Sequence, residues 1–163
     1  MAMLTEKQKK EIIFYKDIID LISKRSKCLS RQIGSIIVFE GRIIAEGWNG
    51  APKGCDERLC KRCKSEHESG KELENALCCH SEINAISSAA YLGFSLRGTS
   101  IYVTNKPCSD CAKAIVACGI KEVYFFEDYK SDYTDYIFRQ NNMKWVFVEM
   151  EKLIWKTKYI YNQ

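Results

Sequence analysis

Residues 80–126 carry most of the information about how this chain folds, and they read HSEINAISSAAYLGFSLRGTSIYVTNKPCSDCAKAIVACGIKEVYFF. Apolar residues recur at helical spacing from His80 to about Gly93, and a short β-branched run follows at Ser100–Thr104. A second helix is expected from Pro107, which suits a first turn, to Gly119, and Glu122–Phe126 is another strand. This alternation of helix and strand predicts a layered α/β domain.

The residues before this stretch add a helix and a β-hairpin. Thr5-x-x-Gln8 is a capping-box pattern, and apolar residues at helical spacing follow it. Two apolar, β-branched segments, Ile33–Phe39 and Arg42–Trp48, flank the turn Glu40-Gly41 and predict the hairpin.

The residues after this stretch complete the fold. A helix is expected at Asp132–Asn141, a fifth strand at Trp145–Glu149, and a helical tail from Glu151. Taken together, the segments predict the fold class α/β, with three layers (α/β/α), a mixed five-stranded sheet, and helices on both faces of that sheet.

The length and composition are those of a single domain, residues 1–163, in which 55–79 form a Cys-rich insertion and 150–163 a C-terminal tail. The net charge of +4 is mild and the basic residues are spread out, so we expect no nucleic-acid partner. No apolar run has the length of a membrane span and the chain does not open on a signal peptide. We therefore expect a cytoplasmic protein without a membrane partner, in which nine cysteines indicate metal binding more than disulfides.

Two short motifs supply the types of residue that bind zinc: H-x-E at residues 80–82 and P-C-x-x-C at residues 107–111. The imidazole of His80 and the thiolates of Cys108 and Cys111 make three ligands for Zn²⁺ and leave a fourth position for water, as in catalytic zinc sites. Both motifs fall where a helix is expected to begin. The free N–H groups and the dipole of a helix N-terminus favour thiolate over thiol.

The combination of H-x-E with P-C-x-x-C is typical of zinc-dependent nucleobase deaminases. In that chemistry Zn²⁺ lowers the pKa of bound water to about 7, and hydroxide adds to C4 of a cytosine ring. Glu82 would move the protons: it takes one from the water, gives it to ring nitrogen N3, and then protonates the departing amine. Glu82 can do this only if it does not itself bind the metal.

The alternative is a structural zinc site that a fourth cysteine closes. The chain would then be a non-catalytic zinc-binding module that binds nucleic acid or another partner through its Cys-rich insertion. Glu82 argues against this alternative, because a purely structural site has no use for a carboxylate beside its only histidine ligand.

Beyond the metal motifs, the chain resembles the deoxycytidylate deaminase family over most of residues 1–130. The similar segments are CLSRQIGSIIV (28–38), GWNGAPKG (47–54, close to G-Y-N-G-x-P-x-G), HSEINAI (80–86, close to H-A-E-x-N-A-I), IYVTNKPC (101–108) and residues 111–129. The N-G-x-P-x-G segment separates this family from other H-x-E deaminases.

The resemblance implies a cytidine-deaminase-like fold and the zinc-dependent hydrolytic deamination of dCMP to dUMP, which releases ammonia and supplies thymidylate synthesis. It also implies a homo-oligomer, often a hexamer, that dCTP and dTTP regulate, with Mg²⁺ accompanying the allosteric nucleotide. A tRNA adenosine deaminase or another nucleobase deaminase remains the alternative. The Asn49 loop and the lack of an evident basic groove argue against the tRNA enzyme.

By the same resemblance, His80, Cys108 and Cys111 match the zinc ligands and Glu82 matches the proton shuttle. The substrate-binding candidates are Arg31, Asn49, Ser81 and Asn84.

Each substrate-binding candidate has its own reason. Asn49 matches an asparagine that meets the sugar. Arg31 is a candidate for the 5′-phosphate, because a guanidinium suits a phosphate, although a solvated hairpin residue is an equal interpretation. Asn84 is expected at the sugar or phosphate, or as a cap of its own helix. Ser81 stands where relatives carry alanine, which is harmless if its backbone N–H holds the ring but alters specificity if the hydroxyl enters the pocket.

A further group of cysteines precedes the helix at His80: Cys55, Cys60, Cys63 and Cys78. Some members of the family bind a second, structural zinc here, and four thiolates would fold an insertion that lacks a core. The residues that could replace one of these ligands are His67, Cys28 and Cys79. The alternative is a loop of reduced, unliganded thiols.

Overall fold

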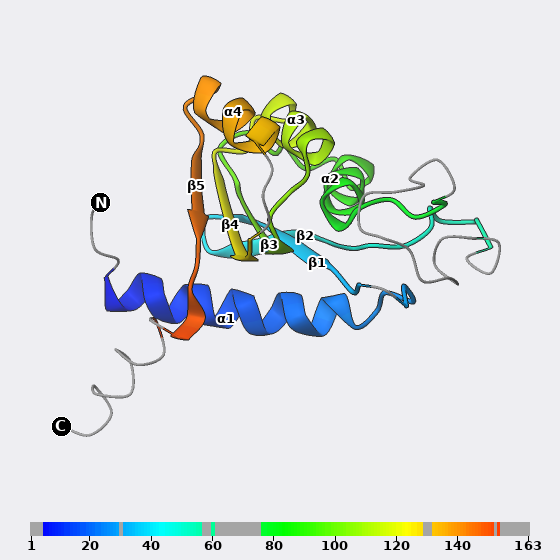
Figure 1. Cartoon of the computed structure of the whole chain (residues 1–163), viewed down its shortest axis with the longest axis horizontal. Helices are drawn as coiled ribbons and strands as arrows, with labels where there is room; N and C mark the ends of the chain where they lie inside the picture. Colours follow the sequence, from blue (N-terminus) through cyan, green and yellow to red (C-terminus); the bar gives the residue numbers. More distant parts are fainter. Residues whose placement is uncertain are drawn as a thin grey trace.

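The computed structural model describes residues 5–29, 31–56, 60, 76–128, 132–151 and 153. Its elements, in chain order, are α1 (Glu6–Ser23), β1 (Gly34–Phe39), β2 (Arg42–Trp48), α2 (Ser81–Tyr91), β3 (Ser100–Asn105), α3 (Ser109–Ala117), β4 (Glu122–Glu127), α4 (Asp132–Gln140) and β5 (Lys144–Phe147). Figure 1 shows three layers: α1 lies on one face of the sheet, and α2, α3 and α4 lie on the other. The predicted α/β/α architecture is confirmed.

The sheet is mixed and has the strand order β2-β1-β3-β4-β5. β1 runs antiparallel to both β2 and β3, whereas β3, β4 and β5 are parallel to one another. The carboxyl ends of β3 and β4 therefore meet at one edge of the sheet, where Asn105 pairs with Glu127. In open α/β sheets this edge is where ligands bind.

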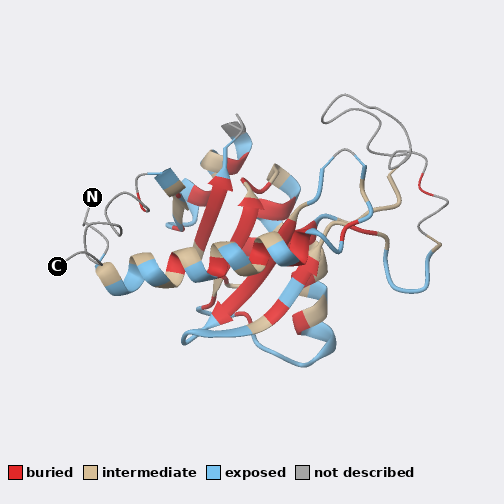
Figure 2. Ribbon diagram, turned by 90° about the horizontal axis from the view of Figure 1, so that it is seen from below, coloured by how far each residue is buried: buried red, intermediate tan, exposed pale blue. Residues whose placement is uncertain are grey.

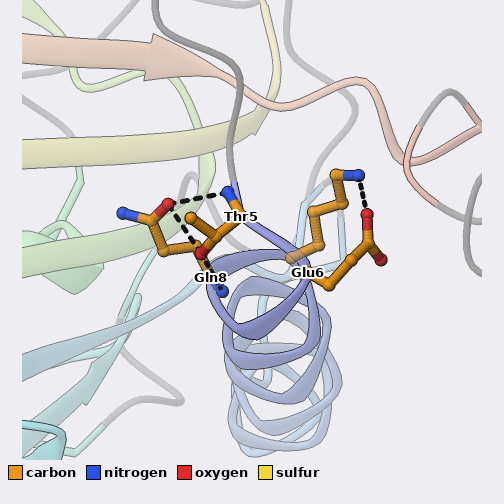
Figure 3. Close-up of polar contacts among 4 residues, drawn as sticks. Thr5, Glu6 and Gln8 are labelled. Atoms are coloured by element: carbon orange, nitrogen blue, oxygen red, sulfur yellow. Dashed lines mark hydrogen bonds and ion pairs between the residues drawn. The ribbon is translucent and has the colours of Figure 1, made fainter.

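The N-terminus of α1 is held by the capping box that the sequence predicts (Figure 3). The backbone N–H of Gln8 donates to Thr5 Oγ1 over 3.2 Å, and the backbone N–H of Thr5 donates to Gln8 Oε1 over 2.9 Å. Glu6 in the first turn also pairs with Lys9. These contacts satisfy N–H groups that a helix start leaves open.

Two apolar clusters lie on the two faces of the sheet, whose central strands are the most buried part of the molecule (Figure 2). The α1 side gathers Ile12, Tyr15, Ile19, Ile36, Tyr102 and Tyr124, among others. The opposite side gathers Ile37, Ala85, Ala89, Val103, Ile115 and Phe125 with their neighbours, and it joins α2, α3 and α4 to the strands. Burial of both clusters is the main stabilising term of the fold.

Glycines let helices approach the sheet closely on both faces. A Cβ at Gly34 would lie 2.3 Å from the Ile19 carbonyl oxygen of α1. A Cβ at Gly47 would lie 2.2 Å from the Ser81 carbonyl oxygen and 2.4 Å from the Ala85 nitrogen of α2. Only glycine fits at these positions, so Gly47 in β2 determines how near the first turn of α2 comes to the sheet.

The predicted element boundaries differ from the structure by a few residues. α3 begins at Ser109, because Pro107 precedes Cys108, which is the N-cap. β5 begins one residue before the predicted strand and ends at Phe147. The predicted tail is described only as far as Leu153, where residues 150, 151 and 153 are helical, and most of the 55–79 insertion lies outside the described residues. Among the described residues, no helix is long and apolar enough to cross a membrane.

Candidate active site

Three side chains of the types that bind metal ions converge at the N-termini of two helices. His80 is the N-cap of α2, Cys108 is the N-cap of α3, and Cys111 lies in the first turn of α3. His80 Nδ1 is 3.4 Å from Cys108 Sγ and 3.3 Å from Cys111 Sγ. β3 and the turn after it bring these residues together, although His80 and Cys111 are separated by thirty-one positions.

The geometry of this group fits a tetrahedral zinc ion. Zn–N bonds of about 2.0–2.1 Å and Zn–S bonds of about 2.3 Å place the nitrogen about 3.6 Å from each sulfur. The two observed separations are close to this value. One imidazole and two sulfurs are also soft donors that suit zinc. In the described part of the chain, this is the one group of at least three such side chains close enough to share an ion.

The two thiols of the group differ in their tendency to ionise. The hydrogen bond from Cys111 lowers the pKa of Cys108 to about 4, with a further contribution from His80. The pKa of Cys111 is raised, first by its hydrogen bond to Cys108 and then by its burial. Cys108 is therefore a thiolate at neutral pH, while Cys111 gives up its proton when a metal binds.

Glu82 supplies a carboxyl group beside the three donors. It lies in the first turn of α2, its residue is only 4% exposed, and it is not one of the grouped ligands. Burial raises the pKa of Glu82, and its carboxylate in turn helps to raise the pKa of Cys111. A buried carboxyl group that can hold a proton beside a metal site is suited to general acid–base catalysis.

Ser81 contacts Glu82 directly, through its hydroxyl group. Ser81 Oγ donates a 2.8 Å hydrogen bond to Glu82 Oε2, and Ser81 is fully buried. The sequence raised the question of whether this hydroxyl enters the pocket. In the structure the hydroxyl is committed to the carboxylate, where it fixes the position of one oxygen.

Asn84 and the loop after β2 hold the N-terminus of α2 in place. Asn84 Nδ2 donates to the Trp48 carbonyl oxygen over 2.7 Å and reaches the Gly50 carbonyl oxygen at 3.4 Å. Gly50 and Cys79 form an isolated antiparallel bridge just before α2. The Asn84 amide group thus contacts the backbone at the end of β2 and in the loop after it. A helix cap would instead contact the first turn of its own helix.

Asn49 also makes backbone contacts through its side chain. Its Oδ1 accepts from the Ile33 N–H at 2.7 Å, and its Nδ2 donates to the Arg31 carbonyl oxygen at 2.9 Å. These contacts tie the segment before β1 to the loop after β2. The position of Arg31 therefore depends on Asn49.

Arg31 lines a hollow of about 330 Å³ at the carboxyl ends of β3 and β4. The other lining residues are Gln32, Ile33, Asn105, Glu127 and Asp128. Arg31 is exposed and is the only basic residue in this lining. The lining also carries the carboxylates of Glu127 and Asp128, so a guanidinium is the one group in it that can bind an anionic part of a ligand.

The turn before Cys108 is held by residues that no sequence motif predicts. Lys106 is 7% exposed, and its Nζ lies 3.0 Å from Asp135 Oδ2 and 3.3 Å from Asp128 Oδ1. Thr134 Oγ1 donates to the Pro107 carbonyl oxygen over 3.0 Å. Two adjacent residues of α4 therefore hold the two residues before a metal-binding cysteine. No motif signals this contact, because its partners are almost thirty positions apart.

Of the second group of cysteines, the structure brings two together. Cys60 Sγ and Cys78 Sγ are 3.7 Å apart, and the Leu77 N–H donates to Cys60 Sγ over 3.4 Å. Cys55 is exposed and is not grouped with them, while Cys63 and the substitute ligand His67 lie outside the described residues. The other two substitutes, Cys28 and Cys79, are partly exposed and are in no disulfide in the described part of the chain.

Comparison with known proteins agrees with the fold and with a zinc-binding family. Residues 8–127 match the family model for the cytidine and deoxycytidylate deaminase zinc-binding region. The deoxycytidylate deaminase of Schizosaccharomyces pombe is 38% identical over 124 residues, which cover 73% of this chain and 38% of that protein. ComE operon protein 2 of Bacillus subtilis is 35% identical over 138 residues, which cover 82% of this chain and 69% of that protein.

A solved structure shares the fold over almost the whole chain. The crystal structure of dCMP deaminase from the cyanophage S-TIM5, in complex with dCMP and dUMP, has a TM-score of 0.72 and 26% sequence identity to this chain. The superposition covers 90% of this chain and 100% of that chain.

Proposed function

Because this chain belongs to the cytidine and deoxycytidylate deaminase zinc-binding family, we propose that it hydrolyses dCMP to dUMP and ammonia. The observation that carries this proposal is the convergence of His80, Cys108 and Cys111 beside the buried carboxyl group of Glu82. Relatives named deoxycytidylate deaminase, and a similar structure bound to dCMP and dUMP, support the choice of substrate.

In this proposal His80, Cys108 and Cys111 hold Zn²⁺, which when bound acts as a Lewis acid and makes water nucleophilic near neutral pH. Glu82 accepts a proton from the attacking water and delivers it to N3 of the cytosine ring. A C–O bond forms at C4. Glu82 then takes the remaining proton from the hydroxyl group at C4 and passes it to the amine, so that the C4–N bond breaks, a C4 carbonyl forms and ammonia leaves. The hydrogen bond from Ser81 holds the carboxylate in one orientation through these transfers.

The remaining substrate contacts are proposed from the hollow that Arg31 lines at the carboxyl ends of β3 and β4. Arg31 would bind the 5′-phosphate, because it is the basic residue of that lining. Asn49 and Asn84 would shape the sugar pocket through the backbone that their amides hold, and Asn49 would also position Arg31. The backbone N–H of Ser81 would meet the ring.

A second, structural zinc would be bound by Cys55, Cys60, Cys63 and Cys78. The separation of 3.7 Å between the sulfurs of Cys60 and Cys78 supports this proposal, since two thiolates on one tetrahedral zinc are about 3.8 Å apart. Metal analysis of the purified chain should then give close to two zinc ions. A value near one that survives Cys60→Ser would reject the second ion.

Regulation and assembly are proposed from the family resemblance. We expect dCTP and dTTP to change the activity, with Mg²⁺ accompanying the nucleotide, and we expect a homo-oligomer, such as a hexamer. Exposed apolar side chains on and just after α2 and on α4 support self-association, namely Tyr91, Leu92, Phe94, Tyr133 and Tyr136. Sedimentation with and without each nucleotide tests both expectations.

A substrate panel with ammonia as the readout tests the proposed reaction. The zinc-loaded chain is assayed with dCMP, CMP, deoxycytidine and an adenosine-containing RNA stem-loop. Turnover should be fastest with dCMP, and Arg31→Ala should raise KM for dCMP far more than for deoxycytidine. Turnover of the stem-loop alone would show a tRNA-type enzyme, and no turnover of any substrate would contradict a deaminase.

A further inference from the structure

The loop after β2 begins with the one Asn-Gly pair of the sequence, Asn49-Gly50. In peptides this is the pair at which asparagine most readily loses its side-chain amide, because glycine has no Cβ to hinder an attack by its backbone nitrogen. Asn49 is partly exposed, so water can reach it. The pair is therefore a candidate site of covalent modification.

The modification requires no reagent other than water. The backbone nitrogen of Gly50 gives its proton to the solvent and attacks Cγ of Asn49. A bond forms between that nitrogen and Cγ, the bond from Cγ to Nδ2 breaks, and the amide group takes up a proton and leaves as ammonia. Water then opens the cyclic imide and leaves aspartate or isoaspartate at position 49.

The fold engages every polar group of Asn49. Its Oδ1 accepts from the Ile33 N–H at 2.7 Å, and its Nδ2 donates to the Arg31 carbonyl oxygen over 2.9 Å. Its backbone N–H donates to the Ile33 carbonyl oxygen over 3.0 Å. Its carbonyl oxygen accepts from Ser26 Oγ at 2.7 Å, and Ser26 is only 3% exposed. The Asn49 side chain is thus fixed at both of its polar atoms.

Gly50, which carries the attacking nitrogen, is held from the side of α2. Its N–H donates to the Cys79 carbonyl oxygen over 3.2 Å, and its carbonyl oxygen accepts from the Cys79 N–H at 2.9 Å. Asn84 Nδ2 reaches the same carbonyl oxygen at 3.4 Å and donates to the Trp48 carbonyl oxygen over 2.7 Å. The attacking nitrogen and Cγ are therefore both restrained, and the reaction requires this segment to open locally.

We propose that Asn49 is the site at which this chain deamidates, and that Ser26 and Asn84 limit the rate by holding the Asn49-Gly50 segment closed. Aspartate at position 49 would still accept from the Ile33 N–H. It would, however, place an oxygen where Nδ2 now donates to the Arg31 carbonyl oxygen. Two acceptors in contact repel each other, so the modified chain no longer holds Arg31 in place.

The first experiment follows the Asn49 amide by mass and uses no substrate. The zinc-loaded full chain is incubated in buffer and digested with trypsin at intervals. Asn49 is the only asparagine of the tryptic peptide Ile43–Lys53, and Asn105, which a lysine follows, is the only one of Gly98–Lys113. The first peptide should gain the mass of one amide-to-acid change well before the second. Equal rates in the two peptides would overturn the proposal.

Two variants test the contacts that hold the segment closed. Asn84→Ala removes the contacts to the Trp48 and Gly50 carbonyl oxygens, and Ser26→Ala removes the contact to the Asn49 carbonyl oxygen. Each should speed the conversion of Asn49 about twofold to tenfold, as the loss of one or two hydrogen bonds from the closed segment predicts.

A matched control removes a side-chain contact to the backbone elsewhere. Asn141→Ala, at the end of α4, should leave the rate at Asn49 unchanged. A rate that Asn84→Ala and Ser26→Ala also leave unchanged would contradict the proposed role of these contacts.

Hydrogen exchange on the unaltered chain gives a measurement that does not depend on how the variants fold. Low concentrations of urea should speed the exchange of the Gly50 N–H and the deamidation of Asn49 by the same factor, because both require the same local opening. Exchange that accelerates without deamidation would overturn the proposal.

The effect on activity rests on the proposed function, in which Arg31 binds the 5′-phosphate. Asn49→Asp should raise KM for dCMP about tenfold and change KM for deoxycytidine, which has no phosphate, much less. An equal KM for dCMP in both chains would overturn the effect on Arg31. No turnover of dCMP by the unaltered chain would instead contradict the proposed function, and the mass measurements do not depend on it.

Discussion

The two groups of cysteines proposed as metal ligands are built in different ways. Cys108 and Cys111 stand on the first turn of α3, and their partner His80 stands at the start of α2, so secondary structure and the sheet place all three donors. Cys60 and Cys78 lie outside helices and strands, and only these two donors of the predicted four come together in the described residues. A site on rigid elements is preorganised for its metal, whereas a site on connecting segments depends on the metal for its order.

The two groups are nevertheless connected through a short segment. Cys78 is two residues before His80, and Cys79 between them pairs with Gly50. The second group therefore anchors the backbone that leads into the first. We expect changes in the first group to abolish chemistry and changes in the second to affect mainly stability.

The largest effect is expected from the loss of a ligand in the first group. Cys108→Ser should reduce bound zinc by about one ion per chain and reduce dCMP turnover to the background rate, because serine does not provide a thiolate. Metal analysis and ammonia release measure the two effects on the same sample. Cys118→Ser, on a cysteine at the end of α3, is the matched control. Normal turnover by Cys108→Ser would remove this residue from the proposed site.

Glu82→Gln separates chemistry from metal binding within the first group. The variant should lower kcat by about 10²–10⁴-fold, because an amide cannot move protons, while the zinc content stays at the wild-type value. Glu46→Gln, on the exposed face of β2, serves as the control. If zinc is lost together with activity, Glu82 is a ligand and not the proton shuttle.

The contacts from α4 test how far the first group depends on its supports. Lys106→Met removes the two ion pairs of Lys106 with Asp128 and Asp135, and Thr134→Val removes the hydrogen bond to the Pro107 carbonyl oxygen. Loss of such supporting contacts typically costs 10–100-fold in metal affinity or activity, and we expect about tenfold in zinc affinity for each variant. Competition with a chromogenic chelator measures the affinity directly. Lys113→Met, which removes an exposed ion pair on α3, should leave it unchanged.

Cys60→Ser tests the second group and should have a smaller effect on catalysis. The variant should lose the proposed second zinc. Its thermal midpoint should fall by several degrees, because each kcal/mol lost from the free energy of unfolding lowers the midpoint of a chain of this size by about 2–4 °C. We expect kcat to stay within about threefold, since the donors of the first group are held by α2 and α3. A loss of activity as large as that of Cys108→Ser would show that the two groups do not differ in the way described.

Among the changes in the first group, the smallest effect is expected from Ser81→Ala. The change removes the hydrogen bond to Glu82 and leaves the backbone N–H in place. A hydrogen bond from a neutral donor to a charged acceptor contributes about 1.5–3 kcal/mol at most, and rearrangement of the site recovers part of this. We therefore expect kcat to fall about twofold to tenfold. Steady-state kinetics with dCMP and with CMP checks this value, and a change confined to KM would place the hydroxyl at the substrate instead.

The order of helices and strands could be predicted from the sequence, because each element is specified by a pattern of residues that lie close together in the chain. Apolar spacing marks α2 and α3, β-branched runs mark the strands, and Thr5 with Gln8 marks the start of α1. The donor set was predictable for a similar reason, since H-x-E and P-C-x-x-C place chemically specific residues at helix starts. These features depend on residues that lie close together in the chain.

The supports of the site could not be predicted, because they join residues that are distant in sequence. The contacts of Asn49 with the segment before β1 arise from packing, and so does the contact of Thr134 with Pro107. Local chemistry thus specifies the elements and the candidate metal donors. Which side chains hold those donors depends on the long-range contacts that form when the layers pack.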